Sequence, residues 1–163
     1  MCDKIRNAVD TDIAQVQYVA KASWHDTYEG IIPMEIQEAF LRYAYSDDIM
    51  KQRMQTSCLL VAERGEHIVG FINLSSPDEQ KQVELFALYL LPGQQRKGIG
   101  KALLLAAIQR MDASSLYVNV ETDNLKGRSF YEKQGFKVVD VFDDDFDGHI
   151  LKTTRMVLRL PVE

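Results

Sequence analysis

The strongest constraint on the fold is one segment in which an apolar strand leads through a turn into a helix. Residues 83–91 read VELFALYLL, a run typical of a strand, which we expect to be buried on both faces. Pro92 and Gly93 end this strand. Residues 98–111 then repeat apolar side chains at helical spacing, with these predicted to face the core: Ala102, Leu103, Ala106, Ala107 and Ile108. A strand that turns directly into an amphipathic helix favours a sheet with helices packed on its faces.

The turn itself, QRKGIG at residues 95–100, has the chemistry of an anion-binding site. The first amides of a helix have no partner inside the helix and carry partial positive charge. Gly98 and Gly100 would let an anion approach the backbone, and Arg96, Lys97 and Lys101 add positive charge. The segment lacks the Gly-Lys-Ser/Thr ending of a Walker A loop and the three glycines of a dinucleotide fingerprint. Taken alone, it is also compatible with an ordinary turn that carries solvated basic residues.

The remaining periodicity predicts further helices and strands around this segment. We expect helices from Thr11 to Trp24, from Pro33 onward and from Ser46 to Gln55. Strands are predicted at residues 4–9, 58–63, 67–74, 116–120, 136–142 and 150–160, with a helix at 125–134 that Gly135 ends. Residues 140–147 are expected to form an acidic loop. Together these elements predict one mixed α/β or α+β domain over residues 1–163.

Composition limits the classes of function. With 46% hydrophobic and 26% charged residues, the chain resembles an ordinary globular protein, and no apolar run approaches the roughly 20 residues of a membrane span. Cys2 and Cys58 are too few for a disulfide framework, so a cytoplasmic location is expected. His25, His67 and His149 lack metal-ligand spacing, and no metal is expected. The net charge of −5 argues against general nucleic-acid binding and mildly favours a cationic partner.

Two motif blocks resemble those of the GCN5-related N-acetyltransferases (GNAT). The first is Pro92-x-x-Gln95-x-x-Gly98-x-Gly100 after Leu88-x-Leu90. The second, at the expected distance, is Asn124, the pair Phe130-Tyr131, and Gly135-Phe136. The family often has alanine where this chain has Gly127, a change that we expect to be tolerated. The resemblance covers residues 5–160 and implies a twisted, mostly antiparallel sheet flanked by helices and splayed at the cofactor strand.

The resemblance also implies acetyl-CoA as the acyl donor, with no metal. The pyrophosphate would be held by the turn, which comprises Gln95, Arg96, Lys97, Gly98, Ile99, Gly100 and Lys101. The pantetheine arm would lie beside the main chain of Leu88 and Leu90, with Tyr89 directed to the opposite face. Asn124 would contact the cofactor arm, cap the following helix, or do both. A bulge usually splays this strand, but the sequence does not locate it.

By the same resemblance, Tyr131 would be the general acid that donates to the departing CoA thiolate, unless it is only a core aromatic beside Phe130 and Phe136. An alkyl ammonium has a pKa near ~10.4, so the acceptor must lose a proton before it attacks. Glu84 is the best-placed carboxylate for this task by comparison with the family. The alternatives are a water chain as the base and a strand-end charge without a catalytic role for Glu84.

The sequence says less about the acceptor amine than about the acyl donor. Residues 24–29 are expected to form a loop in which Trp24, Tyr28 and Glu29 line the acceptor pocket, or in which the aromatic side chains merely cover the sheet. Five aspartates in residues 140–147 could attract a polyamine, although such a run is often a solvated hairpin tip.

The expected enzyme acetylates a primary amine of a small, polyamine-like or peptide acceptor. The alternatives are a non-catalytic acyl-CoA-binding regulatory module and, disfavoured by charge, a nucleic-acid-binding module. The last strand, with Met156, Val157 and Leu158, could serve as a homodimer edge.

Overall fold

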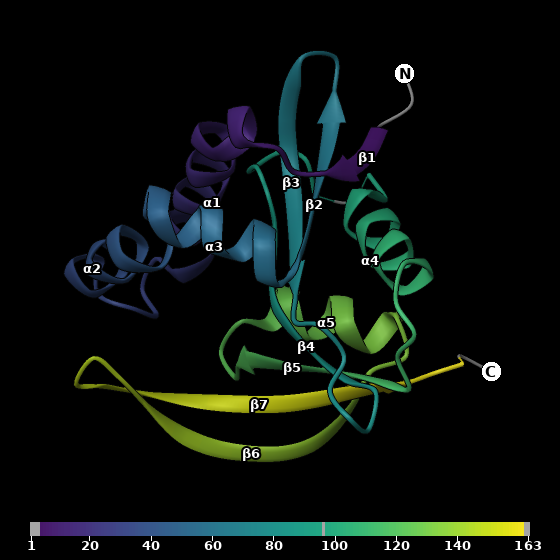
Figure 1. Cartoon of the computed structure of the whole chain (residues 1–163). Coiled ribbons are helices and arrows are strands. Elements are labelled where there is room, and N and C mark those ends of the chain that lie inside the picture. The colour runs from purple at the N-terminus through teal and green to yellow at the C-terminus, as the bar shows by residue number, and fades with distance from the viewer. Residues whose placement is uncertain (1–3, 96, 162–163) are drawn as a thin grey trace.

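The computed structural model describes residues 4–95 and 97–161 and places a seven-stranded sheet between two groups of helices (Figure 1). The strand order is β1-β2-β3-β4-β5-β7-β6. The strands are β1 (Lys4–Asn7), β2 (Cys58–Arg64), β3 (His67–Leu74), β4 (Gln82–Leu90), β5 (Ser115–Glu121), β6 (Lys137–Phe146) and β7 (His149–Arg159). Neighbouring strands are antiparallel except β4 and β5, which are parallel. The predicted mixed, mostly antiparallel α/β fold is therefore confirmed.

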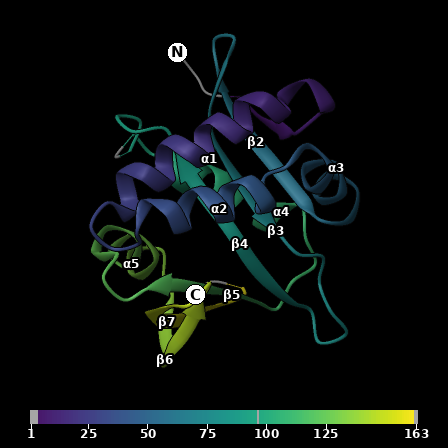
Figure 2. The same cartoon turned by 90° about the vertical axis from the view of Figure 1, so that its left-hand side faces the viewer.

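Helices cover both faces of the sheet and create two hydrophobic cores (Figure 2). The helices are α1 (Ile13–Tyr28), α2 (Met34–Ala44), α3 (Asp47–Thr56), α4 (Ile99–Gln109) and α5 (Leu125–Lys133), with a 3₁₀ turn at Asp10–Asp12 before α1. The first three pack on one face and the last two on the other. Side chains alternate along a strand, so on β3 Phe71 enters the core beneath α1 and its neighbour Ile72 enters the core beneath α4. None of the described helices is both long enough and apolar enough to span a membrane.

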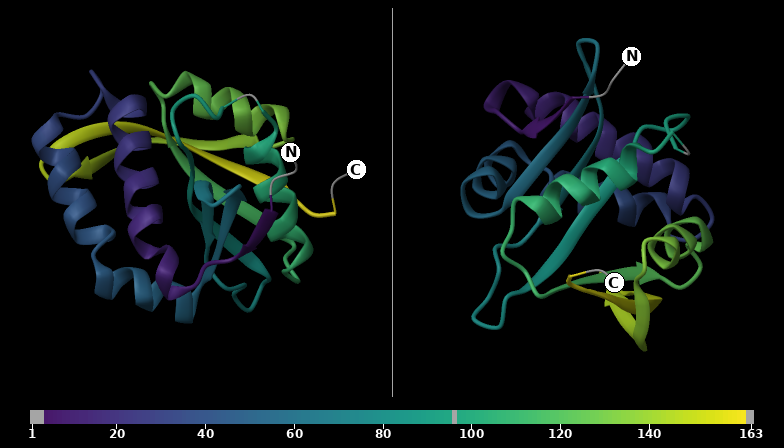
Figure 3. Two further views of the ribbon diagram at one scale, coloured as in Figure 1. Left: turned by 90° about the horizontal axis from the view of Figure 1, so that it is seen from above. Right: turned by 90° about the vertical axis from the view of Figure 1, so that its right-hand side faces the viewer.

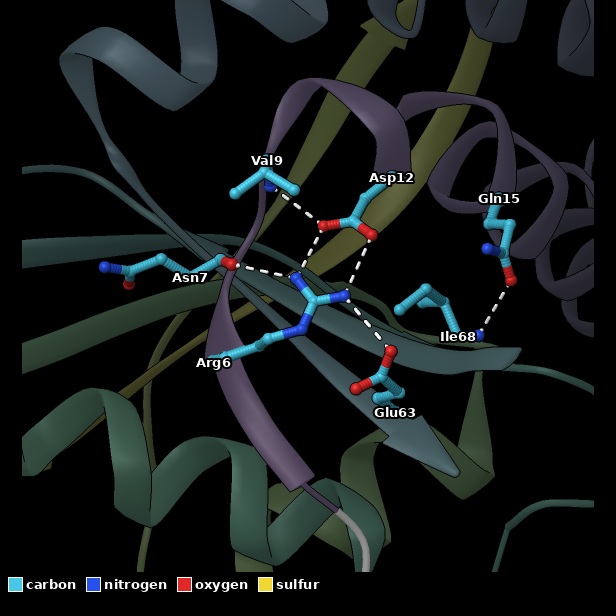
Figure 4. Close-up of polar contacts among 7 residues, drawn as sticks. All are labelled: Arg6, Asn7, Val9, Asp12, Gln15, Glu63 and Ile68. Carbon is cyan, nitrogen blue, oxygen red and sulfur yellow. Dashed lines mark hydrogen bonds and ion pairs between the residues drawn. The ribbon is translucent and has the colours of Figure 1, made fainter. Parts of the chain in front are cut away.

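A cluster of charged side chains ties the first strand to the first helix (Figure 4). The guanidinium of Arg6 on β1 donates to both carboxylate oxygens of Asp12, at 2.7 and 3.0 Å, and to Glu63 of β2 at 3.3 Å. Asp12 also accepts a bond from the amide of Val9 at 2.8 Å. One buried carboxylate thereby holds β1, the 3₁₀ turn and the start of α1 in a single arrangement.

Several local signals in the sequence act as predicted. Ser46 caps α3 by accepting a bond from the amide of Ile49 at 3.3 Å. Asn124 caps α5 by accepting from the amide of Gly127 at 3.0 Å. Gly135 follows α5 with a φ of 100°, the left-handed conformation that ends many helices. These features were predictable because each depends only on residues within one turn of the chain.

Two segments that were expected to be loops are regular structure. The helix α1 continues to Tyr28, because Trp24 and Tyr28 extend the buried stripe at four-residue spacing, so residues 24–28 are not a loop. The acidic segment is the second half of β6, and only Asp147 and Gly148 form the turn to β7. The aspartates are tolerated in a strand because β6 lies at the edge of the sheet and is largely exposed.

Two expectations about burial and edges were also wrong. The strand β4 is not buried on both faces, since the side chain of Phe86 is 57% exposed and Glu84 is partly exposed. The last strand, β7, lies between β5 and β6, and Met156, Val157 and Leu158 are buried. A dimer edge at β7 is excluded by this strand order, which places β6 at that edge of the sheet.

Candidate functional site

The strands β4 and β5 separate halfway along their length. Their parallel pairing joins residues 82–85 to residues 115–118 and ends there. At this point β4 contains a bulge, because Leu85 pairs with Leu74 and Ala87 with Asn73, which leaves Phe86 as an extra residue. Beyond the bulge, the main chain of β4 has no strand partner on the β5 side within the described residues. Figure 2 shows β4 running obliquely away from β5. The free main chain of Leu88 and Leu90 suits the predicted contact with an extended pantetheine arm.

The turn after β4 presents unpaired amides to the same region. Gly98 has a φ of 80° and precedes α4, whose first helical bond runs from the Ala102 amide to the Gly98 carbonyl at 3.0 Å. Among the residues that the structure describes, the amides of residues 97–101 have no hydrogen-bond acceptor. Gln95 accepts a bond from the Gly93 amide through its side chain at 3.0 Å. These residues fit a diphosphate group; Arg96, also predicted for this role, lies outside the described residues.

Close packing fixes the start of α4 against α5. A Cβ atom on Gly100 would lie 3.2 Å from Cε1 of Phe130, so a side chain there would require the Phe130 ring to shift. A Cβ atom on Gly127 would lie 2.6 Å from Nδ2 of Asn124. An alanine at this position would therefore displace the side chain that caps α5, whereas the glycine of this chain, expected from the sequence to be tolerated, leaves room for it. Gly100 thus lets the first motif block pack against the second, and Gly127 leaves room for the Asn124 cap within the second block.

We expect Gly98→Ala to weaken acetyl-CoA binding several-fold and to destabilise the fold by about 1 kcal/mol, because a left-handed φ strains any residue with a Cβ atom. Isothermal titration with CoA and urea unfolding would measure the two effects. The matched control is Gly93→Ala, since Gly93 has a φ of 88° but lies before the unpaired amides. An equal loss of CoA affinity in both variants would contradict the assigned role of the turn.

Four titratable side chains from four elements meet where β4 and β5 separate: Tyr28 of α1, Tyr89 of β4, Glu121 of β5 and Tyr131 of α5. The Tyr28 hydroxyl lies near Tyr89 and the Glu121 carboxylate, and both neighbours add to the rise that burial causes in the pKa of Tyr28. Tyr131 is near enough for the Glu121 charge to affect its ionisation. Tyr28 and Tyr131 are only 4% and 8% exposed, whereas Glu121 is partly exposed. The cluster therefore combines buried phenols with one carboxylate that solvent can reach.

Burial controls the protonation of this cluster. Burial raises the pKa of Tyr131 well above its ordinary range, and the negative charge of Glu121 adds to the rise. The phenol therefore stays protonated at neutral pH and can donate a hydrogen bond. Burial also raises the pKa of Glu121, while the hydrogen bond from Tyr28 opposes this change. A carboxyl group with a raised pKa holds a proton more readily than an ordinary surface carboxylate.

Glu84, predicted from the sequence as a candidate base, lies in the paired part of β4 opposite Tyr117. Its carboxylate forms an ion pair with Arg155 of β7, with a second contact at 3.3 Å. Arg155 in turn donates to Asn119 at 2.9 Å, and its guanidinium lies 4.6 Å from the Tyr117 ring centre. Glu84 is thus part of a sheet-bridging group before the point of separation, and its role as a base stays a prediction.

Sequence reasoning missed Glu121. The residue directly follows the predicted strand 116–120 and precedes Asn124 of the second motif block by three positions. A carboxylate at the carboxyl end of a buried strand was therefore a usable signal. What the sequence could not show is that Tyr28, far away in the chain, contacts it.

The residues predicted to line the acceptor pocket lie on or next to the end of α1. Trp24 is buried, stacks on Phe40 with ring centres 4.6 Å apart, and lies 6.0 Å from Phe146 of the β6–β7 hairpin. Glu29 follows the last residue of α1 and is exposed. The structure therefore brings Tyr28 to the titratable cluster and places Trp24 in an aromatic group beside it. Among the described residues, no group of three or more side chains is arranged to hold a metal ion.

Comparison with known proteins agrees with this geometry. The family model described as Acetyltransferase (GNAT) family matches residues 20–136. The chain is 34% identical over 155 residues to a spermidine N(1)-acetyltransferase of Thermoplasma acidophilum, covering 90% of this chain and 95% of the relative. It is 30% identical over 149 residues to the uncharacterized N-acetyltransferase YuaI of Bacillus subtilis, covering 88% of this chain and 84% of that protein.

A solved structure superimposes on nearly the whole chain. The crystal structure of the PaiA N-acetyltransferase from Thermoplasma acidophilum in complex with coenzyme A superimposes with a TM-score of 0.84 at 32% identity, over 98% of this chain and 99% of that one. That match spans the separated strands, the turn and both motif blocks. The chain therefore belongs to the GNAT family and is an acetyl-CoA-dependent N-acetyltransferase.

Proposed function

We propose that the acceptor is a primary amine of a small, polyamine-like cation. The observation that carries this proposal is the position of the acidic strand β6. Phe146 at its end lies 5.1 Å from Phe40, which sets the hairpin tip beside α2 (Figure 3). The strand carries Asp140, Asp143, Asp144 and Asp145, and Asp144 lies close enough to Glu121 to act on its charge. The Asp144 carboxylate shares the face of the sheet that carries Glu121 and would attract a second ammonium group, and the other exposed aspartates of β6 would add to the negative potential at this edge of the sheet.

The relatives add independent support, because one of the two curated relatives described above carries the name spermidine N(1)-acetyltransferase. The proposed roles in catalysis follow from the geometry. The unpaired amides of the turn hold the pyrophosphate, the free main chain of β4 aligns the pantetheine arm, and Tyr131 donates to the CoA sulfur as it leaves. Holding both reactants in one place supplies much of the rate enhancement.

A panel of amines tests the acceptor. Release of the CoA thiol would be followed with spermidine, spermine, putrescine, a simple alkyl monoamine, an amino acid, an aminoglycoside and a peptide with a free amino terminus. We expect kcat/KM to be highest for a polyamine. We also expect this constant to fall more steeply with added salt for the polyamine than for the monoamine, because salt screens attraction by exposed carboxylates. Preference for the amino acid or the peptide would contradict the proposal.

We further propose a cytoplasmic location, supported by the presence of only two cysteines. Fractionation of cells that express the protein would test it.

The homodimer stays a prediction, and any pairing through the edge of the sheet formed by the β6–β7 hairpin would use β6 rather than β7.

A further inference from the structure

The group that takes the acceptor's proton must lie beside the acetyl group and must be reachable by an amine. Glu121 meets both conditions, because it ends β5 beyond the last pair with β4 and remains partly exposed. Its side chain shares a face of the sheet with Thr153 of β7, its partner in register, and with Phe142 of β6, which also pairs with Thr153. This is the face from which α1 and α2 approach.

The neighbours of Glu121 come from every element around it. They are the Tyr28 hydroxyl of α1, the Tyr89 hydroxyl of β4, the Tyr131 hydroxyl of α5 and the Asp144 carboxylate of β6. Among the described residues, no cation is a cause of the shift in the pKa of Glu121. Glu84 differs in this respect, since Arg155 already occupies its carboxylate. A carboxylate surrounded by phenols and a second carboxylate is therefore matched to a positive charge that arrives from outside.

We infer that Glu121 binds the ammonium group of the acceptor and takes its proton before attack, an assignment that rests on the proposed amine acetylation. The acceptor nitrogen gives one proton to the Glu121 carboxylate, which later releases it to solvent. The nitrogen lone pair then forms the bond to the acetyl carbon while the carbon–sulfur bond breaks. Tyr131 gives its proton to the leaving sulfur, and the second proton lost by the nitrogen returns through solvent to the Tyr131 oxygen. The products are the amide, the free CoA thiol and one proton.

If Glu121 binds the reacting amine, Asp144 is placed to contribute to the choice of acceptor. It lies on the strand that leads away from Glu121, and it is exposed. An acceptor with a second ammonium group can place that charge near Asp144 while the first amine occupies Glu121. Asp144→Asn should therefore raise KM for a diamine several-fold and leave the KM of an alkyl monoamine nearly unchanged.

The central experiment compares Glu121→Gln with Asp123→Asn, which removes one carboxylate charge two residues away at an exposed position. We expect Glu121→Gln to lower kcat/KM by about 100-fold, the ordinary contribution of a general base. The wild-type profile of kcat/KM should fall on the acid side as Glu121 becomes protonated, and Glu121→Gln should lose this limb. The Kd for CoA and the thermal midpoint should match those of Asp123→Asn, which keeps wild-type activity.

Chemical rescue separates a catalytic role from a structural one. We expect added formate to restore part of the activity of Glu121→Ala, because a small carboxylate can enter the space and accept the proton, and to leave Asp123→Ala unchanged. Retention of the acid limb in Glu121→Gln, or its loss in Glu84→Gln instead, would overturn the assignment. If the wild-type enzyme prefers an amine that is not a polyamine, the acceptor proposal falls, and the same comparison with that amine still decides the role of Glu121.

Discussion

Tyr131→Phe is expected to lower kcat by about 100-fold while the Kd for acetyl-CoA changes little, because the substitution removes one hydroxyl that acts only as the thiolate leaves. The ring itself remains packed, with centres 5.2 Å from Phe130 and 5.1 Å from Phe136. Burial keeps the hydroxyl protonated by raising its pKa, so the wild-type kcat should not fall through ionisation of Tyr131 at neutral or moderately alkaline pH.

Steady-state thiol release and titration with CoA would measure the two quantities. Tyr117→Phe is the matched control, since it also removes one phenol from this half of the protein but lies under Arg155, in the paired part of β5. An unchanged kcat in Tyr131→Phe would remove the hydroxyl from the mechanism. A comparable loss in Tyr117→Phe would show that the effect is not specific to the position of Tyr131.

Asp12→Ala is expected to destabilise the protein by about 2–3 kcal/mol, because it leaves Arg6 without its main partner and the Val9 amide without an acceptor. Asp12 is 4% exposed, whereas Arg6 keeps contact with solvent and with Glu63, which places the expected loss below that of a fully buried pair. Urea unfolding of the two proteins at pH 7 would measure this difference.

The contribution of Asp12 should also depend on pH. The hydrogen bonds from Arg6 hold the pKa of Asp12 below its ordinary value despite its burial. A carboxylate with a depressed pKa stabilises the fold fully above its unfolded pKa, near 3.8, and loses this effect as the pH falls through the folded value. The stability difference between the wild type and Asp12→Ala should therefore shrink below about pH 4. The exposed Asp10→Asn serves as the control, and a difference independent of pH would contradict the ion pair.

The β-bulge and the titratable cluster differ from the motif blocks in how far the sequence could predict them. Three local features were predicted correctly: the turn before α4, the Asn124 cap and the glycine after α5. A few consecutive residues determine each of them. The acidic segment was misread as a loop, because aspartates disfavour strands on average and only the edge position of β6 makes them acceptable.

The sequence by itself therefore determined the glycine turn before α4, the second motif block and the alternation of helices and strands, which are local consequences of glycine, capping and periodicity. Only the tertiary structure decided that Phe86 forms the bulge, that β4 and β5 separate, and that Glu121 meets Tyr28 and Tyr131. The physical reason is that strand register depends on partners distant in the chain. A shift of one residue in that register moves every side chain to the other face.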